Sequence, residues 1–250
     1  MRNETDTTAG HSLRPDQWLS GVMGRQVWRV EHGTEGEPFS RLAGPGSFFA
    51  YAKVPVGEIG TVSRFTDAGF RLVDTALSFE GKIGGDAVDG GIRFARPEDR
   101  WSVAAIAAGA FRYSRFHLDP LVPRTLAAAI KSAWAANYFD GKRGDGMIVA
   151  ERDDRVVGFL QLLWSSPDHL VIDLIGVEPA SQGRGIGREM ILYAARHGTG
   201  NGRAPSRIAV GTQAANVPSV RLYESLGLRL TAAQYVLHHH GKGRQDGDDH

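Results

Sequence analysis

From residue 92 onward, stretches of the chain with strand-like spacing of apolar residues are followed by stretches with helix-like spacing. Runs with period two or a continuous apolar character predict strands, and apolar spacings of three and four predict helices. The expected strands are residues 92–95, 146–151, 155–164, 169–177, 207–213 and 228–239. The expected helices are residues 97–110, 124–138, 183–197 and 218–226. Helices interspersed among strands in this order predict an α/β domain with a mixed sheet.

The first 91 residues have shorter and less regular patterns. Short strands are expected near Trp28 and at residues 48–54 and 70–79, with a helix at 58–67 between the last two. The stretch before residue 92 is rich in glycine and aspartate, which is typical of a linker. The predicted organisation is a polar, loosely held segment (1–25), a small N-terminal α/β domain (26–80), a linker (81–91), a second domain (92–240) and a polar tail (241–250).

Composition narrows the class of protein. The chain has 250 residues, of which 42% are hydrophobic and 23% are charged, as in ordinary globular proteins. Its net charge of +1 gives no bulk attraction to nucleic acid or an anionic membrane. The lack of cysteine excludes disulfides, thiolate metal sites and a cysteine nucleophile. Neither an apolar run of membrane-spanning length nor a signal peptide is evident, so a cytoplasmic protein is expected.

A glycine-rich turn follows the expected strand at 169–177 and opens the next helix. The turn reads Gln182-Gly183-Arg184-Gly185-Ile186-Gly187. A helix start leaves backbone N–H groups unpaired, and glycine lets that backbone approach an anion closely. The turn therefore fits a pyrophosphate, to which Arg184 and Arg188 could add charge-assisted contacts.

Three other interpretations of this turn can be compared with a phosphate site. A Walker loop requires Lys and then Ser or Thr after its glycines, and none is present. A Rossmann turn requires an acid about 20 residues further on, where Gly202, Arg203 and Ala204 stand. An ordinary strand-to-helix turn explains the stretch equally well when the turn is considered alone.

A second motif follows the next expected strand and decides between these interpretations. It runs Asn216-Val-Pro-Ser-Val-Arg-Leu-Tyr223-Glu-Ser-Leu-Gly227. In order and spacing the two motifs resemble the GNAT superfamily of acetyl-CoA-dependent N-acetyltransferases. The family's Gln/Arg-x-x-Gly-x-Gly/Ala turn is matched by Gln182, Gly185 and Gly187. Its later Asn and Leu-Tyr-Glu-x-x-Gly are matched by Asn216, Tyr223, Glu224 and Gly227.

The resemblance implies a GNAT fold, in which a mixed sheet splays apart at its centre around the pantetheine arm of acetyl-CoA. It assigns the cosubstrate to Ile175, Gly176, Val177, Gln182, Gly183, Arg184, Gly185, Ile186, Gly187, Arg188 and Asn216. Gly176 also suits a bulge or a close approach of the backbone. Asn216 has an equally good alternative role as a helix N-cap.

Tyr223 is the expected catalytic acid. Attack of an amine on the thioester expels a thiolate, which a positioned phenol can protonate. Backbone N–H groups at the splayed strand would stabilise the oxyanion. The alternative is a core tyrosine with a satisfied hydroxyl. The lack of cysteine agrees with direct transfer between the two substrates.

A narrower resemblance covers both halves of the chain. It rests on residues 69–74, 114–117, 134–137 and 234–237. These short motifs are similar to the nucleotide-amino-sugar N-acetyltransferases, among them TDP-fucosamine acetyltransferase. The glycine-rich linker and the polar tail depart from that pattern. The resemblance implies an acceptor that is a nucleotide-linked amino sugar, with a dTDP-linked 4-amino-dideoxy sugar expected, and a homodimer.

The resemblance also places residues at the acceptor. Asp74 falls where the family carries a carboxylate near the amino-sugar pocket, and such a group could take the proton of the ammonium. A paired structural aspartate is the alternative. The expected substrate-binding residues are Arg115, Phe116, His117 and Asn137. The cation and rings around Arg115 suit a nucleotide, although a loop packed over the sheet is as good an explanation.

Two further polar features receive structural interpretations. Adjacent strand residues point to opposite faces, so His238–His240 are not expected to converge on a metal ion. Asp173, inside the core strand, is expected to face solvent or to cap a polar group of the sheet.

Two other functions stay open on the sequence. One is acetylation of a different amine, such as a protein N-terminus, an aminoglycoside or a small amine. The other is a non-catalytic acyl-CoA-binding sensor, against which Tyr223 argues.

Overall fold

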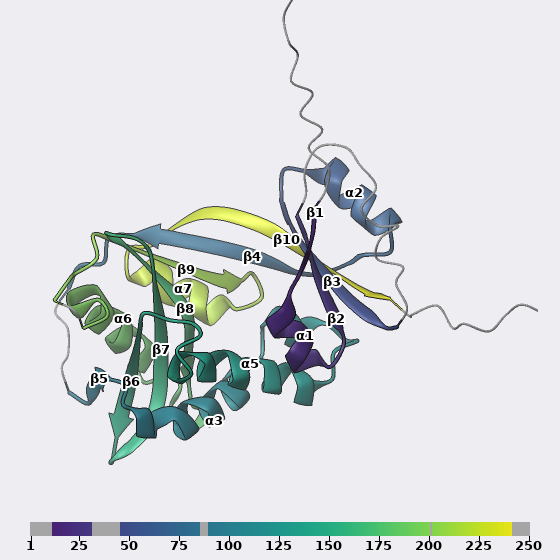
Figure 1. Ribbon diagram of the computed structural model, residues 1–250. Helices are drawn as coiled ribbons and strands as arrows, with labels where there is room; N and C mark the ends of the chain where they lie inside the picture. Colours follow the sequence, from purple (N-terminus) through teal and green to yellow (C-terminus); the bar gives the residue numbers. More distant parts are fainter. Residues whose placement is uncertain (1–11, 32–45, 86–89, 201, 242–250) are drawn as a thin grey trace, which may run out of the picture. The chain divides into compact units, whose positions relative to one another are not determined.

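The computed structural model describes residues 12–31, 46–85, 90–200 and 202–241 (Figure 1). The chain divides into two compact units. The first unit contains residues up to Thr75 and those from Gln234 onward, and the second contains Ala76–Ala233. Strands β4 (Arg71–Gly81) and β10 (Arg229–Gly241) supply residues to both units.

The division between the units lies inside these long strands, whereas the sequence pattern placed a domain boundary at the glycine-rich stretch 81–91. A strand of this length can belong to two units because its successive parts pair with different neighbours. The last six residues of β4 pair with β9 of the second unit. Residues 86–89 of the predicted linker, and 242–250 of the predicted tail, lie outside the described residues.

The first unit is built on β1 (Ser12–Pro15), β2 (Gln26–Glu31) and β3 (Phe48–Pro55), together with its parts of β4 and β10. β1 pairs antiparallel with β2, which pairs in parallel with β3. β3 in turn pairs antiparallel with β10, from Gln234 to Gly241. The helices of this unit are α1 (Gln17–Met23) and α2 (Ile59–Asp67). Its core joins strand residues such as Ala50, Val54 and Leu237 to Phe65 of α2.

The prediction that residues 1–25 are loosely held is wrong for the part that the structure describes. Residues 12–25 contain β1 and α1, and Leu19 of α1 is buried. Asp16 caps this helix, because its Oδ1 accepts the Leu19 N–H at 3.0 Å. Its Oδ2 accepts the Tyr51 hydroxyl of β3 at 2.9 Å. The segment is short and polar in composition, so its few buried contacts leave a weak pattern. Residues 1–11 lie outside the described residues.

The second unit is a mixed sheet with strand order β4-β9-β8-β7-β6-β5. Its own strands are β5 (Ile92–Phe94), β6 (Gly146–Arg152), β7 (Arg155–Ser166), β8 (His169–Val177) and β9 (Arg207–Gln213). β8 and β9 pair in parallel, and the pairs β4–β9, β5–β6, β6–β7 and β7–β8 are antiparallel.

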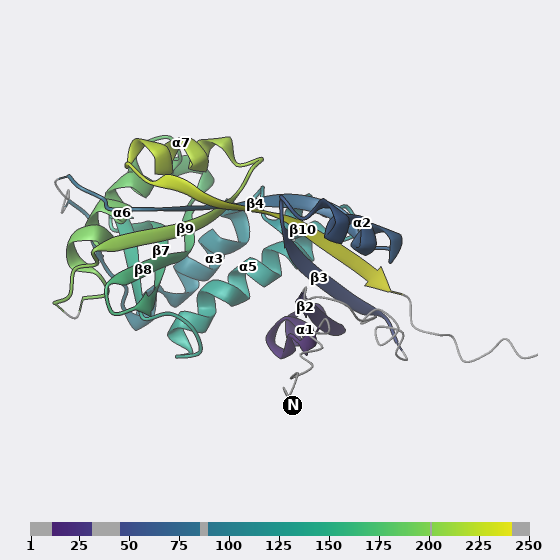
Figure 2. The same ribbon diagram turned by 90° about the horizontal axis from the view of Figure 1, so that it is seen from above.

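Helices cover both faces of this sheet. They are α3 (Arg100–Ala110), α4 (Arg115–Leu118), α5 (Arg124–Phe139), α6 (Ile186–His197) and α7 (Val217–Ser225). Figure 2 shows α6 and α7 on one side of the sheet and α3 and α5 on the other. Each side has a buried apolar cluster, one with Met190 and Leu226 and the other with Val103 and Ala135. Both faces of the central strands are therefore covered.

The structure confirms the predicted α/β class and the predicted order of strands and long helices from residue 92. β6 and β7 form a hairpin that turns at Asp153 and Asp154, which both have positive φ (49° and 57°), as a type I′ turn requires. The short helix α4 lies in a stretch that the pattern left as a loop. No helix in the described ranges is long and apolar enough to span a membrane.

Candidate functional site

β8 and β9 separate halfway along their length. They pair in parallel from His169 opposite Arg207 to Ile172 opposite Val210. β8 then continues to Val177, still paired with β7 along its other edge. Among the described strands, none pairs with the β9-facing edge of β8 beyond Ile172. This is the central splay that the family resemblance predicts, and it leaves backbone N–H and C=O groups of β8 facing the gap.

A β-bulge lies where the strands part. The β7–β8 register shifts between Gln161, opposite Leu174, and Leu162, opposite Ile172, so Asp173 is the additional residue. The bulge also reverses the alternation of side chains. Ile172 packs in the cluster under α6, whereas Leu174 packs in the cluster under α3 and α5. Regular alternation would put these two residues on one face.

The glycine turn leads from the splayed end of β8 to α6. Gly183 and Gly185 have φ of +78° and +81°, a conformation that favours glycine, and a Cβ at either position would meet nothing within 4 Å. Gly185 is the N-cap of α6, and no side chain caps the helix. The first N–H groups of α6 therefore lack intrahelical partners, beside open space.

The polar side chains of the turn have different surroundings. Gln182 donates its Nε2–H to the carbonyl of Val177 at 3.0 Å, which ties the turn back to the end of β8. Arg188 Nη1 lies 3.4 Å from the carbonyl oxygen of Ser225. Arg184 is exposed. Gln182 thus orders the turn, while the two arginines stand at its surface.

Gly176 accommodates a neighbouring ring rather than a bulge. A Cβ at this position would lie 2.8 Å from the ring of Phe159 on β7. Of the two alternatives expected at Gly176, the structure shows close packing, against the Phe159 ring. The bulge lies three residues earlier, at Asp173. Ile175 and Val177 flank Gly176 and pack toward the α6 side of the sheet.

Asn216 caps α7. Its Oδ1 accepts the Ser219 N–H at 3.4 Å, and its Nδ2 donates to Thr212 Oγ1 on β9 at 3.2 Å. These contacts match the N-cap role and also join α7 to the strand that lines the splay. A contact of Asn216 with pantetheine stays a prediction.

Tyr223 lies on α7 in the buried core, with 2% of its surface exposed. Its ring centroid is 5.9 Å from that of Phe79. Burial raises the pKa of the phenol to about 12, while a hydrogen bond with the Ser219 side chain acts in the opposite direction. The phenol therefore keeps its proton at neutral pH, which a general acid requires. Tyr223 is therefore packed as a core residue, and its role as an acid stays a prediction.

Three of the residues expected at the acceptor lie on α4, which contacts α5. The Arg115 guanidinium lies 4.4 Å from the centroid of the Phe116 ring, which is 1% exposed. His117 Nδ1 is 2.6 Å from Ser114 Oγ, and burial, Lys131 and Arg124 lower the pKa of His117.

Asn137 is buried, and its backbone carbonyl accepts the backbone N–H groups of Lys142 and Arg143 beyond the end of α5. The structure shows how these residues are held, and their contact with an acceptor stays a prediction.

Asp74 lies on β4 and belongs to the first unit, whereas Tyr223 and the glycine turn belong to the second. Its side chain is buried, with 7% of the residue exposed. A buried carboxylate is compatible both with a base and with a structural partner. Its predicted role at the acceptor is therefore carried forward as a proposal.

Asp173 is the residue whose importance the sequence pattern missed. Its side chain is 8% exposed and does not face solvent. It accepts hydrogen bonds from Arg143 at 2.7 and 2.6 Å, from Trp134 Nε1 at 2.8 Å and from Gln161 Nε2 at 3.3 Å. This carboxylate raises the pKa of Arg143. The signal in the sequence was an acid inside an otherwise apolar strand.

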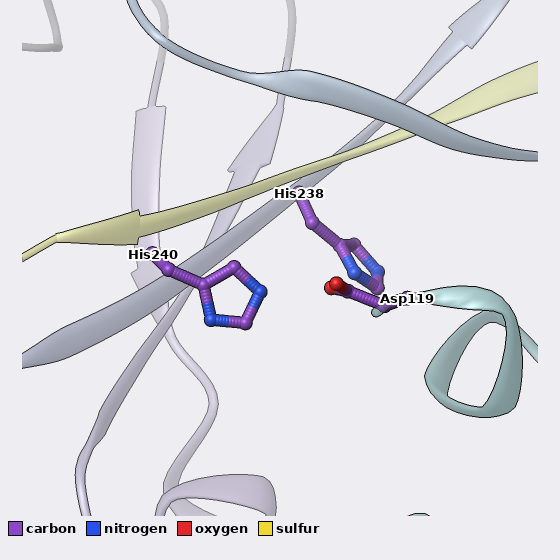
Figure 3. A group of neighbouring side chains, drawn as sticks. All are labelled: Asp119, His238 and His240. Atoms are coloured by element: carbon purple, nitrogen blue, oxygen red, sulfur yellow. The ribbon is translucent and has the colours of Figure 1, made fainter. Parts of the chain in front are cut away.

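Strand alternation does not separate all three histidines of β10 as expected, because it puts His238 and His240 on one face, with ring centroids 6.4 Å apart. His238 and His240 extend from the same face of the strand (Figure 3), and Phe49 of β3 contacts both rings, at centroid distances of 4.7 and 5.0 Å. His239 points to the other face, where its Nδ1 lies 2.8 Å from the Gly69 carbonyl oxygen. Within the first unit these rings are part of an aromatic cluster.

A mixed sheet that splays beside an uncapped helix start is the arrangement that the GNAT resemblance predicts. Residues 113–228 match the Acetyltransferase (GNAT) family. A solved structure from Novosphingobium aromaticivorans, described as a GNAT-family protein, has a TM-score of 0.53 and 18% identity. That similarity covers 86% of this chain and 84% of the other, and it concerns the fold.

Two curated relatives are similar in sequence. The chain is 30% identical over 148 residues to the spore coat polysaccharide biosynthesis protein SpsD of Bacillus subtilis, covering 57% of this chain and 48% of that protein. It is 38% identical over 110 residues to the mycothiol acetyltransferase of Thermomonospora curvata, covering 43% of this chain and 34% of that protein. The chain thus spans about half the length of the first relative and about a third of the second.

Proposed function

We propose that the chain is an acetyltransferase that transfers acetyl directly from acetyl-CoA to an amine. The observation that carries this proposal is the splay of β8 from β9 next to the open N-terminus of α6. The free edge of β8 can hydrogen-bond the amides of a pantetheine arm, and the start of α6 can bind a pyrophosphate. Both features belong to the second unit, which contains the GNAT match.

In the proposed reaction, the amine nitrogen attacks the thioester carbon and a tetrahedral oxyanion forms. An N–H group on the free edge of β8, in the stretch Ile175–Val177, donates to that oxyanion. The C–S bond then breaks, and the thiolate takes the proton of the Tyr223 phenol, while the former amine nitrogen gives up its second proton and so restores the phenol. With a pKa of about 12 the phenol is protonated before the bond breaks, and burial makes it a weaker acid than an exposed tyrosine.

The acceptor that we propose is a nucleotide-linked amino sugar, a dTDP-linked 4-amino-dideoxy sugar in particular. Support comes from the additional N-terminal unit, from the short motifs shared with nucleotide-amino-sugar acetyltransferases, and from a relative named for polysaccharide biosynthesis. In this proposal Asp74 takes the proton of the attacking ammonium, and Arg115, His117 and Asn137 bind the nucleotide sugar. A cytoplasmic homodimer completes the proposal.

The relative named as a mycothiol acetyltransferase supports a second candidate, in which the acceptor is a different primary amine. The two candidates share the cosubstrate site and the chemistry at Tyr223. They differ only in the acceptor, so one assay with a panel of amines separates them.

The assay measures release of CoA with a thiol-reactive dye. The chain has no cysteine, so the protein contributes no thiol signal. Acetyl-CoA is supplied with nucleotide-linked amino sugars, an aminoglycoside, a peptide with a free N-terminus and simple amines. Preferential turnover of a dTDP-linked amino sugar is the expected result. Turnover of another amine alone would support the second candidate, and acetyl-CoA binding without any release would indicate a sensor.

A further inference from the structure

We propose that Asp173 is a positioning residue whose carboxylate, held by Trp134, Arg143 and Gln161, maintains the β-bulge that separates β8 from β9. The effect on catalysis rests on the proposed function, because it assumes that acetyl-CoA binds in the splay. The effect on the strand does not rest on it. Asp173 makes no proposed contact with either substrate.

The first argument is position. Ile172 is the last residue of β8 that pairs with β9, and Asp173 is the next residue and the additional residue of the bulge. A bulge bends its strand and increases the local twist, so it directs the following residues away from a neighbour. The end of pairing and the bulge therefore have one structural cause at one residue.

The second argument is the way the carboxylate is held. Its donors come from three parts of the second unit: Trp134 from α5, Arg143 from the loop after α5, and Gln161 from β7, directly opposite the bulge. Arg143 binds both carboxylate oxygens and its guanidinium lies 5.2 Å from the centroid of the Trp134 ring. A bulge interrupts the regular pairing of two strands. The hydrogen bonds from these three side chains hold the Asp173 carboxylate in place and so keep the bulge at this residue.

Gln161 adds independent support. Its side chain is fully buried, and within the described residues its Oε1 has no hydrogen-bond partner. The Nε2 group faces Asp173 Oδ2 and the Arg143 carbonyl instead, at 3.3 and 3.4 Å. The opposite amide orientation would place Oε1 against the carboxylate, so the charge of Asp173 sets the orientation of Gln161. A buried acceptor is left unpaired to serve this carboxylate.

The consequence reaches the site through the backbone. Beyond the bulge, Ile175 and Val177 pack toward α6, and Leu174 packs toward α3 and α5. The edge of residues 174–177 is left open on the β9 side. Loss of the hydrogen bonds to Asp173 would shift this edge of β8. A displacement of about 1 Å in a positioning group can lower the reaction rate by up to about a hundredfold.

The test compares Asp173→Asn with Asp99→Asn. Asp99 is a matched control, because it is also a buried carboxylate bound by both terminal nitrogens of one arginine (Arg93, 2.7 and 3.0 Å), but it lies in the short 3₁₀ turn after β5. Calorimetric titration with acetyl-CoA should show a Kd about tenfold higher for Asp173→Asn. Asp99→Asn should lose stability and keep the wild-type Kd. Trp134→Phe, which removes one donor and keeps a ring, should raise the Kd by a smaller factor.

A kinetic readout separates positioning from simple destabilisation. For Asp173→Asn the KM for acetyl-CoA should rise more than kcat falls, because a saturating concentration of acetyl-CoA still fills the weakened site and largely restores turnover. Equal Kd values for wild type and Asp173→Asn, or equal weakening in Asp99→Asn, would overturn the proposal.

Hydrogen exchange on the protein without ligand keeps this inference separate from the proposed function. The amides of residues 172–177 should change their protection in Asp173→Asn, since the released strand either loosens or pairs further with β9. Unchanged protection there would overturn the proposal. If the wild-type protein binds no acetyl-CoA, the proposed function fails and this exchange measurement alone decides the role of Asp173.

Discussion

At the scale of single residues, Tyr223 carries the chemistry of the proposal. The substitution Tyr223→Phe keeps the buried ring beside Phe79 and removes only the acidic proton. We expect kcat to fall by about a hundredfold, with the acetyl-CoA Kd unchanged, because general acid catalysis contributes factors of this size. Steady-state CoA release and calorimetric titration measure the two constants.

The matching pH profile has a defined sign. The pKa of Tyr223 is raised to about 12, so the acid stays protonated and its contribution to kcat persists through neutral and mildly alkaline pH. A Tyr223→Phe enzyme within about threefold of wild type would assign the protonation of the thiolate to water or another group.

Gly185 tests the turn at the same scale. Its φ of +81° strains any other residue by roughly 1–2 kcal/mol, although its Cβ position is open. Gly185→Ala should fold, lose about that much stability and bind acetyl-CoA at least severalfold more weakly, because the strained turn no longer presents its N–H groups correctly.

Gly141→Ala provides the control for this strain. Gly141 also has a positive φ (+65°) and open space, but it follows α5, away from the turn. Equal acetyl-CoA affinity in both variants and wild type, by titration, would remove the turn from the binding site.

At the scale of elements, α7 links capping to catalysis, since Asn216 caps the helix that carries Tyr223. Asn216→Ala should lower the free energy of unfolding by about 1 kcal/mol in denaturant titrations. Asn216→Asp should keep most of the wild-type stability, because Asp is also a good N-cap. We expect the acetyl-CoA Kd to stay near wild type in both. A large rise in Kd with little change in stability would instead establish the pantetheine contact.

The elements also show how far the sequence could predict this structure. Strand and helix positions in the second unit follow from apolar periodicity, and the glycine turn follows from residues whose local chemistry is nearly independent of context. The bulge at Asp173 could not be predicted in this way, because it depends on Trp134, Arg143 and Gln161, which are distant in sequence. Helix α1 was missed for a different reason, because it is short and buries only Leu19 and Met23.

At the scale of the whole molecule, the proposal requires residues of both units in one reaction. Asp74→Asn keeps the size of the side chain and removes its charge and basicity. Turnover of the amino-sugar acceptor should fall, and its pH dependence should shift toward higher pH, where the free amine is more abundant. The acetyl-CoA Kd should not change, since the turn and the splay lie in the second unit. A pH–rate profile equal to wild type would make Asp74 structural.

The account as a whole depends on acetyl-CoA binding between β8 and β9 and at the start of α6. Amide hydrogen exchange with and without acetyl-CoA measures this directly, residue by residue. We predict that added acetyl-CoA increases protection at residues 175–177 and 184–187, with little change at β5 and β6. Binding that leaves both stretches unchanged, or that protects only other parts of the second unit, would contradict the account.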